Sequence, residues 1–402
     1  MSKEKRRVPK LRFPGFTEDW EQRKLESLFT KYEDKVNTPN SGYWRLGLRS
    51  HCKGTFHTYI DAGNELETAE MNRVKSGNFI LNITFAWERA LAVTNDEDQD
   101  KLVSHRFPQF KPNSDLVIDF FKHTLMDKRF KHHLELSSPG GAGRNKVLKV
   151  ADMLKYELLV PSIKEQNEIS SFLNHVDYII TLHQRKLEHL NLKKKALLQK
   201  LFPKNGERYP ELRFPGFTDA WEQRKFGEIY ERAGQKNDLT YGIDKIISVA
   251  NMYFKKDVIV GSEEYLKTYN VFKLGDIAFE GHTNKEYRYG RFVENTIGDG
   301  IVSHIFDVFT PKINLDINFW KDLIKYEPIM GPILRRCTKA SRMMSNLTTK
   351  EFLEEQILCP TLEEQKFIGE FIVSLDKNIT LHQRKLEHLQ LQKKALLQQM
   401  FV

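Results

Sequence analysis

The sequence predicts a mixed α/β protein made of two similar α/β domains. The domains are expected to be related by a pseudo-twofold axis and separated by an antiparallel coiled coil of two long helices. Three observations support this fold class: the chain repeats its own ends, the segments between them mix β-rich runs with amphipathic helices, and each repeat closes with a heptad pattern. The predicted boundaries are a first domain at 1–161, a first helix at 162–203, a linker and second domain at 204–360, and a second helix at 361–402.

The repeated ends are nearly identical, whereas the segments between them have diverged. "LRFPGFTEDWEQRK" at 11–24 returns as "LRFPGFTDAWEQRK" at 212–225. "ITLHQRKLEHLNLKKKALLQKLF" at 180–202 returns at 379–401 with four of 23 positions changed. In the middle, only short traces such as "LVSHRFPQF" (102–110) and "IVSHIFDVF" (301–309) keep the register. The pattern indicates that the two middles share a fold but contact different things, while the ends are held constant by something common to both halves.

Both middles combine strand and helix patterns. Runs such as "DKIISVANMYF" (244–254) and "GDIAFEG" (275–281) are β-rich and bounded by turn residues. Segments 119–136 and 318–334 have the apolar spacing of amphipathic helices. Each middle is therefore expected to be a mixed α/β domain.

Each repeat ends in a predicted coiled-coil helix, because its apolar positions alternate in spacing between three and four residues. The predicted seam consists of Val176, Ile180, His183, Leu187, Leu190, Lys194, Leu197 and Leu201 in the first helix, and of Leu375, Ile379, His382, Leu386, Leu389, Lys393, Leu396 and Met400 in the second. One such helix cannot bury its stripe alone, so we predict that the two copies pair in antiparallel orientation. The predicted register places His183 opposite Lys393, and Lys194 opposite His382. The alternative is that these polar side chains extend from the seam edge into solvent.

Bulk properties favour an anionic partner and a cytoplasmic location. The net charge is +9, and a field of that sign attracts nucleic acid. The three cysteines, Cys52, Cys337 and Cys359, have no CxxC spacing, which argues against a disulfide framework or zinc site. No apolar run follows the basic N-terminus, and no run of 18 apolar residues occurs, so neither a signal peptide nor a transmembrane helix is expected.

No catalytic or metal-binding signature stands out. "GGAGRNK" (140–146) lacks the spacing of a phosphate-binding loop, and the motifs of adenine methyltransferases are absent. Asp316, Asp322 and Lys325 are interpreted as a solvated helix face. His51, Cys52 and His57 are attributed to a turn between strands, and the repeated His105 and His304 to the shared fold. The sequence therefore predicts no catalytic residue and no metal site.

Two segments at the same position in each half are candidates for DNA contact. Segments 137–148 and 335–347 are rich in Gly, Ser, Arg and Lys, which lets the backbone approach a duplex and offers side chains to bases and phosphates. The candidate residues are Arg144, Lys146, Arg335, Arg336, Lys339 and Arg342. The alternative for each is an ordinary solvated charge, and the same two readings apply to the basic run 193–195.

Taken together, these motifs resemble those of one protein family. "LRFPGF" followed by Trp opens each half, "PSIKEQNEIS" (161–170) and "PTLEEQKFI" (360–368) close each domain, and the "LHQRKLEHL" helices follow. In this order, and over essentially all 402 residues, the chain resembles the specificity (S) subunit of type I restriction–modification systems.

This resemblance implies a non-catalytic subunit that binds double-stranded DNA. The two middles would be target recognition domains, each reading one half of a bipartite asymmetric sequence. The helices would set the gap and dock two methyltransferase subunits, and restriction/translocase subunits would join. This chain would bind no cofactor, since S-adenosylmethionine, ATP and magnesium would be held by the partner subunits. The alternatives are a coiled-coil scaffold without a DNA role, and a stand-alone sequence-specific nuclease or methyltransferase.

Overall fold

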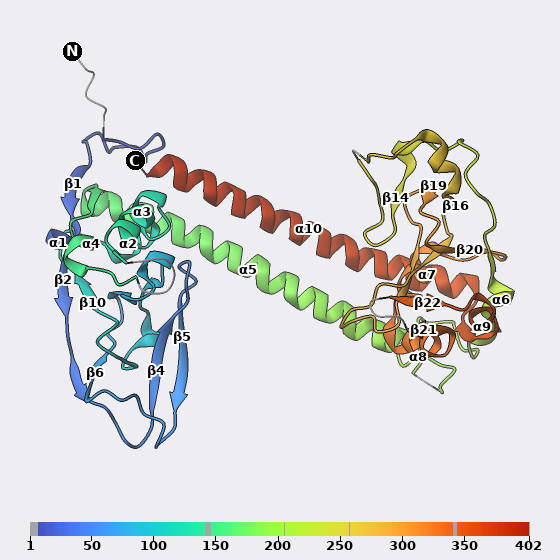
Figure 1. The fold of residues 1–402 in the computed structure, drawn as a ribbon, viewed down its shortest axis with the longest axis horizontal. Helices are drawn as coiled ribbons and strands as arrows, with labels where there is room; N and C mark the ends of the chain where they lie inside the picture. Colours follow the sequence, from blue (N-terminus) through green and yellow to red (C-terminus); the bar gives the residue numbers. More distant parts are fainter. Residues whose placement is uncertain (1–6, 141–145, 205, 257, 341–343, 402) are drawn as a thin grey trace, which may run out of the picture. The chain divides into compact units, whose positions relative to one another are not determined.

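Two helices of 39 residues each, α5 (Ile163–Leu201) and α10 (Leu362–Met400), are the longest elements of the computed structural model (Figure 1). The structure describes residues 7–140, 146–204, 206–256, 258–340 and 344–401. It forms two compact units, one with the residues up to Leu182 and those from Leu386 onward, the other with His183–Lys385. Each unit therefore contains one α/β domain and a segment of both long helices. The mixed α/β fold class predicted from the sequence is confirmed.

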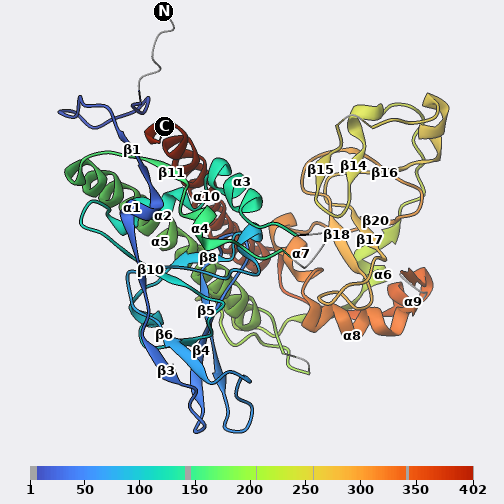
Figure 2. The same cartoon turned by 60° about the vertical axis from the view of Figure 1, so that its left-hand side comes forward.

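The first domain contains two main sheets and one short strand pair. Its helices are α1 (Leu25–Leu28), α2 (Ile118–Thr124), α3 (Lys128–Leu136) and α4 (Val150–Met153), with 3-10 turns at Ala86–Glu88 and Asp96–Asp98. The strand pair is β1 (Glu21–Lys24) with β11 (Glu157–Val160). The four-stranded sheet has the order β2 (Phe29–Tyr32), β10 (Gln109–Pro112), β7 (Phe79–Leu81), β8 (Leu91–Val93). The five-stranded sheet has the order β3 (Lys35–Asn37), β6 (Glu70–Arg73), β9 (Leu102–Val103), β4 (Tyr43–Leu48), β5 (Thr55–Ile60), and Figure 2 shows β4 beside β5.

The second domain repeats the four-stranded sheet in the same order. Its strands are β13 (Tyr230–Arg232), β20 (Asp307–Pro311), β17 (Ile277–Glu280) and β18 (Arg291–Glu294), and β12 (Glu222–Lys225) pairs with β23 (Gln356–Cys359). Its helices are α6 (Phe226–Ile229), α7 (Ile317–Leu323), α8 (Glu327–Cys337) and α9 (Thr349–Glu354), with 3-10 turns at Ile243–Lys245 and Glu263–Thr268.

Among the described residues of the second domain, the remaining strands form three separate pairs instead of a five-stranded sheet. The pairs are β14 (Ile247–Ser248) with β15 (Tyr253–Phe254), β16 (Asn270–Phe272) with β19 (Gly300–Val302), and β21 (Thr338–Ala340) with β22 (Ser345–Leu347). The two domains thus share one sheet frame and differ in what surrounds it.

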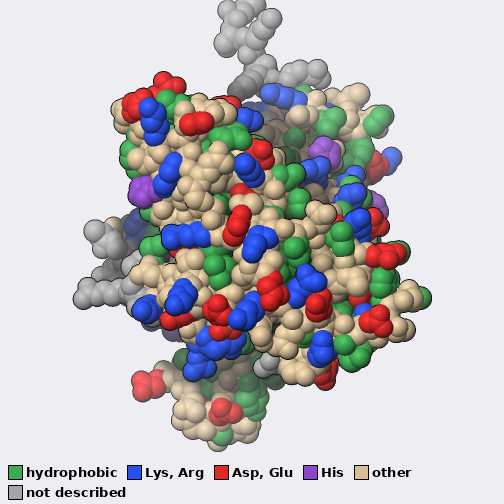
Figure 3. All heavy atoms as spheres, turned by 90° about the vertical axis from the view of Figure 1, so that its right-hand side faces the viewer, with side chains coloured by type: hydrophobic (Ala, Val, Ile, Leu, Met, Phe, Trp, Pro, Cys, Tyr) green, Lys and Arg blue, Asp and Glu red, His purple; other side chains and the backbone are tan. Residues whose placement is uncertain are grey.

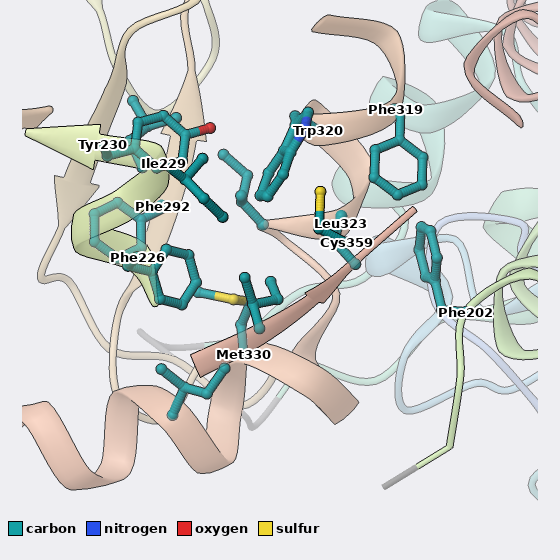
Figure 4. Close-up of a cluster of buried hydrophobic side chains, with 14 of the residues drawn as sticks. Phe202, Phe226, Ile229, Tyr230, Phe292, Phe319, Trp320, Leu323, Met330 and Cys359 are labelled. Carbon is teal, nitrogen blue, oxygen red and sulfur yellow. The ribbon is translucent and has the colours of Figure 1, made fainter. Parts of the chain in front are cut away.

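Each domain buries aromatic side chains from the end of a long helix. In the second unit, Phe202 directly follows α5 and its ring centroid lies 5.9 Å from that of Phe319. Figure 4 shows Phe202 and Phe319 within the cluster that also contains Trp320 and Phe226. In the first unit, Phe401 follows α10 and packs 6.2 Å from Trp20 and 5.3 Å from Phe120, centroid to centroid. The ends of both helices are therefore part of the domain cores.

The repeated opening and closing motifs form a partly buried ionic clamp in each domain. Arg12 Nε and Nη2 donate to the two carboxylate oxygens of Glu165 at 2.7 and 2.8 Å, and Arg213 makes the same pair of bonds to Glu364. Such fork-to-carboxylate pairing has strict geometry. The adjacent glutamines, Gln166 and Gln365, accept from the backbone N–H groups of Val117 and Asp316 at 2.8 and 3.1 Å. These contacts give the repeated "LRFPGF" and "EQ" motifs a role in the fold itself.

Within each unit the segments of α5 and α10 run antiparallel, but the predicted register is wrong. In the second unit His183 lies opposite His382, with 3.1 Å between their Nδ1 atoms. Lys194 donates to Asp376 at 2.7 Å, and in the first unit Lys393 donates to Asp177 at 2.5 Å. The sequence interpretation overlooked these two aspartates. A carboxylate compensates the lysine charge at the seam, which an opposing histidine does not.

Candidate nucleic-acid interface

The predicted DNA-contact residues fall into three groups in the structure. Arg144 and Arg342 lie outside the described residues. Lys146 places its ammonium 5.1 Å from the centre of the Trp87 ring, and Arg336 forks onto Glu355 at 2.8 and 2.5 Å. Arg335 and Lys339 are exposed. Contact of these residues with DNA remains a prediction.

The two segments that carry these residues lie at equivalent places. Leu148 N donates to Ile83 O at 2.8 Å, and Ser345 N donates to Gly281 O at 2.7 Å. Ile83 lies two residues after β7, and Gly281 directly follows the equivalent strand β17. The described ends of both predicted segments, at Leu148 and Ser345, therefore lie beside the same connection of the shared four-stranded sheet.

A tight turn lies at the same end of that sheet in both domains. Phe107 N donates to Ser104 O at 3.0 Å, and Phe306 N donates to Ser303 O at 3.1 Å. Because Gln109 pairs with Ile80 and Asp307 with Phe279, this turn is adjacent to the connection that follows β7 or β17. The turn carries His105 and Arg106 in the first domain, and His304 and Ile305 in the second, all exposed.

The turn of the first domain borders a hollow of about 550 Å³. Arg45, Asn82 and Phe56 line this hollow together with His105 and Arg106. A side chain at Gly47 would bring its Cβ within 2.3 Å of the Phe56 ring, so glycine lets the ring lie flat over β4. The site combines forked donors, an amide and aromatic surface, which are the groups that contact base edges in a duplex.

The charge of the chain does not by itself mark this site. Figure 3 shows Lys and Arg side chains interspersed with Asp and Glu on the face in view. Several charged side chains form ion pairs within the protein or are buried. The interpretation of Asp322 and Lys325 as part of a solvated helix face is therefore wrong. Asp322 accepts from Lys194 at 3.1 Å, and burial lowers the pKa of Lys325. Asp316 caps α7 by accepting from Phe319 N at 2.9 Å.

Within the part of the chain that the structure describes, no group of three or more His, Cys, Asp or Glu side chains is arranged to hold a metal ion. His51 and Cys52 lie in the left-handed turn between β4 and β5, with φ of 63° and 54°. His57 Nε2 lies 2.7 Å from Asp98 Oδ1. All three cysteines are free thiols, and burial raises the pKa of Cys337 to about 12. In the same described ranges, no helix is both long enough and apolar enough to cross a membrane.

The long helices present a second surface. All sixteen predicted seam positions are buried or half-buried. On the opposite side, the first unit exposes Leu182 (45%) and Leu391 (66%), and the second exposes Leu381 (65%) and Leu192 (68%). We call these four residues the outer leucines. Leu182 and Leu381 are equivalent in the repeat, as are Leu192 and Leu391, so each unit presents one leucine of each kind.

The chain as a whole is similar to proteins of known sequence and structure. The chain is 25% identical over 274 residues to the MjaVIII type I restriction enzyme specificity subunit of Methanocaldococcus jannaschii, an alignment covering 62% of this chain and 61% of that protein. The match therefore spans less than two thirds of that relative's length.

Two solved structures share the fold. The type I restriction–modification S subunit of M. genitalium superposes with a TM-score of 0.57 at 13% identity, covering 98% of this chain and 99% of that one. A chain from a structure describing complex assembly and conformational transition of a type I system gives 0.56 at 16% identity, with 98% and 99% coverage. The sequence profile described as "Type I restriction modification DNA specificity domain" matches residues 17–192 and again residues 218–391. With both halves matched, the chain belongs to the family of type I restriction–modification DNA specificity proteins.

Proposed function

We propose that this chain is the non-catalytic specificity subunit of a type I restriction–modification complex. It reads a bipartite asymmetric target in double-stranded DNA, one half-site with each domain. It positions two methyltransferase subunits and the restriction subunits on that target. The observation that carries the proposal is the pairing of one shared sheet frame with two different sets of loops, in a chain of this family.

The difference between the domains supports two distinct half-sites. Base sequence is read by side chains that reach base edges, while contacts to phosphates set position and orientation. The equivalent turns at one end of the sheet carry Arg106 in one domain and Ile305 in the other. The same backbone frame therefore presents side chains that would make different contacts with base edges.

The outer leucines support two copies of one protein partner. Isolated exposed apolar residues are ordinary on a protein surface, but here the same pair recurs in both units. The residues that flank Leu182 and Leu381 are also identical. A duplicated surface fits a duplicated ligand, and we assign it to the methyltransferase. S-adenosylmethionine, ATP and magnesium then belong to the partner subunits, and the complex works in the cytoplasm beside the DNA.

The decisive experiment is methylome sequencing of cells that express this chain with its methyltransferase, against cells that express the methyltransferase alone. A motif of the form half-site, gap, half-site, methylated on both strands and dependent on this chain, is the expected result. A stable complex that produces no new methylated motif contradicts the proposal and favours a scaffold without a DNA role.

Stoichiometry is tested by native mass spectrometry of the purified complex. We expect two methyltransferase subunits per chain, one after Leu391→Glu, and none in the variant that carries both Leu192→Glu and Leu391→Glu. Lys186→Glu, an exposed change on α5, the helix that carries Leu192, is the control and should keep both partners.

A further inference from the structure

We propose that the residue after the shared histidine of the sheet-end turn specifies one base of each half-site. Arg106 would read a guanine in the first half-site and Ile305 a thymine in the second. The inference rests on the proposed function, and names residues that act within it.

The backbone of this turn is anchored in both domains, although by different hydrogen bonds. Val103 and Val302, just before the turn, are completely buried. In the first domain Ile83 N donates to Arg106 O at 3.0 Å. In the second, Asn270 Nδ2 donates to Phe306 O at 2.9 Å. The apex is therefore placed by buried neighbours, whereas its side chain is left in solvent, which suits a position whose chemistry differs between readers.

Arg106 has the properties expected of a base-reading arginine. Its side chain is exposed, and no carboxylate partner is found for it among the residues that the structure describes. Elsewhere in this domain Arg12 and Arg23 are paired with Glu165 and Asp115. An unpaired guanidinium fork matches the O6 and N7 acceptors of guanine in the major groove.

The residues beside the turn also differ between the domains, with a charged side chain in the first and an apolar one in the second. Arg45 lines it in the first domain and is paired in register with Leu102. The equivalent parallel bridge of the second domain joins Ile246 to Ile301, and Ile246 is buried. The first domain thus offers a second arginine beside Arg106, whereas the second domain fills this place with a core side chain.

Ile305 is exposed to 63% at the apex of its turn. The fold gains nothing from an isoleucine there, because Phe306 makes the core contact. Apolar contact with the C5 methyl group is the feature that distinguishes thymine in the major groove. An exposed isoleucine at the position of Arg106 therefore suits a thymine.

The test uses reciprocal substitutions. The whole chain, as wild type, Arg106→Ile or Ile305→Arg, is expressed with its methyltransferase, and the methylated motif is read by genome-wide sequencing. For Arg106→Ile we expect methylation to fall about tenfold at sites with the original guanine, with the second half-site unchanged. Ile305→Arg should alter one position of the second half-site and leave the first intact.

Two further variants separate base reading from simpler roles. Arg106→Lys keeps the charge but loses the fork, so it should relax the same position, whereas an unchanged motif would indicate only a phosphate contact and overturn the proposal. Lys111→Ile, an exposed change on β10, should leave the motif as it is.

The outcomes are distinguishable from failure of the proposed function. If the wild-type chain directs no bipartite motif, the proposed function itself fails and the inference with it. If the wild-type motif appears and both apex variants keep it, the function stands and the inference is overturned. If Ile305→Arg abolishes methylation at all sites and the methyltransferase no longer co-purifies, the turn is a protein contact and the inference is again overturned.

Discussion

Glu294 on β18 is an acid in a place built for an apolar residue. It is 1% exposed, and neither carboxylate oxygen has a hydrogen-bond partner within the described residues. The equivalent residue of the first domain is Val93, because Val93 pairs with Phe79 as Glu294 pairs with Ile277. Burial raises the pKa of Glu294 well above its ordinary value, against the opposing effect of Lys325. The native state therefore disfavours the charged form of this side chain.

Glu294→Val should stabilise the protein. A folded-state pKa raised above the unfolded value means that stability is lost as pH rises above about 4.5, so the replacement removes a penalty that is present at pH 7. We expect a gain of about 1–3 kcal/mol in the free energy of unfolding at pH 7, shrinking toward pH 4.5. Urea denaturation at both pH values measures it, and Val93→Glu is the converse control. Lower stability of Glu294→Val at pH 7 would mean that the carboxylate has a favourable role.

His123 makes the first unit sensitive to acid. Burial, helped by the nearby Lys393, lowers the pKa of His123 to about 4. The unfolded chain takes up this proton near pH 6.5, so stability falls as pH drops from about 6.5 toward 4. Between pH 6.5 and 4.5, the free energy of unfolding of His123→Asn should fall by about 2 kcal/mol less than that of the wild type. Each unit of pKa difference corresponds to about 1.4 kcal/mol.

The pH dependence of the melting temperature measures this effect. His105→Asn, an exposed histidine in the same unit, is the control and should follow the wild-type profile. Parallel profiles for His123→Asn and the wild type would show that His123 is solvated.

At the scale of elements, the long helices are tied differently into the two units. In the second unit Lys194 donates to Asp376 of α10 and to Asp322 of α7. Burial is the largest single influence on the pKa of Lys194 and lowers it, but Asp322 and Asp376 together outweigh it and raise the pKa. In the first unit Lys393 pairs with Asp177, and the position of Asp322 is taken by His123. Asp322 thus joins α7 of the second domain to the seam, and the first domain has no carboxylate at this position.

This difference predicts unequal responses to matched substitutions. Asp177→Ala leaves Lys393 half-buried beside a neutral histidine and should cost about 1 kcal/mol of unfolding free energy. In Asp376→Ala, Asp322 still pairs with Lys194. The loss of unfolding free energy should therefore be less than about half of the loss for Asp177→Ala. Thermal denaturation of the two single variants, with Asp322→Ala and Asp376→Ala combined as a third, provides the comparison. Equal losses from the two single substitutions would show that Asp322 contributes nothing to the seam.

At the scale of the whole chain, the end of a long helix contacts the opening segment of a domain in the same way in both units. Only in the second unit are the two segments also joined by a short stretch of chain. Leu212 N donates to Lys200 O at 2.8 Å in the second unit, where the linker joins helix to domain. In the first unit Leu11 N donates to Gln399 O at 2.9 Å, so the two ends of the chain make the same contact without a peptide link. The nearly identical sequence at both places explains why one packing arrangement recurs.

A circular permutant should therefore fold. The new chain begins at Arg208, runs through Phe401, continues through a copy of the linker sequence into Arg7, and ends at Glu207. We expect a melting temperature within a few degrees of the wild type, because the domain cores and both ionic clamps are retained. Calorimetry of the permutant tests this. A permutant that begins inside α2, for instance between Phe120 and Phe121, cuts a core helix and should not fold.

Much of this protein was determined by the sequence alone. The duplication, the mixed α/β class, the two long helices and the family all follow from repeat spacing and motif order, which need no knowledge of distant contacts. The tertiary structure decided the rest. Only the fold places Asp177 and Asp376 against the seam lysines, which is why the predicted register was wrong. The sequence register already aligns Arg106 with Ile305, but only the fold shows that each lies exposed in a tight turn at the same end of the shared sheet, because exposure depends on contacts between segments far apart in the chain.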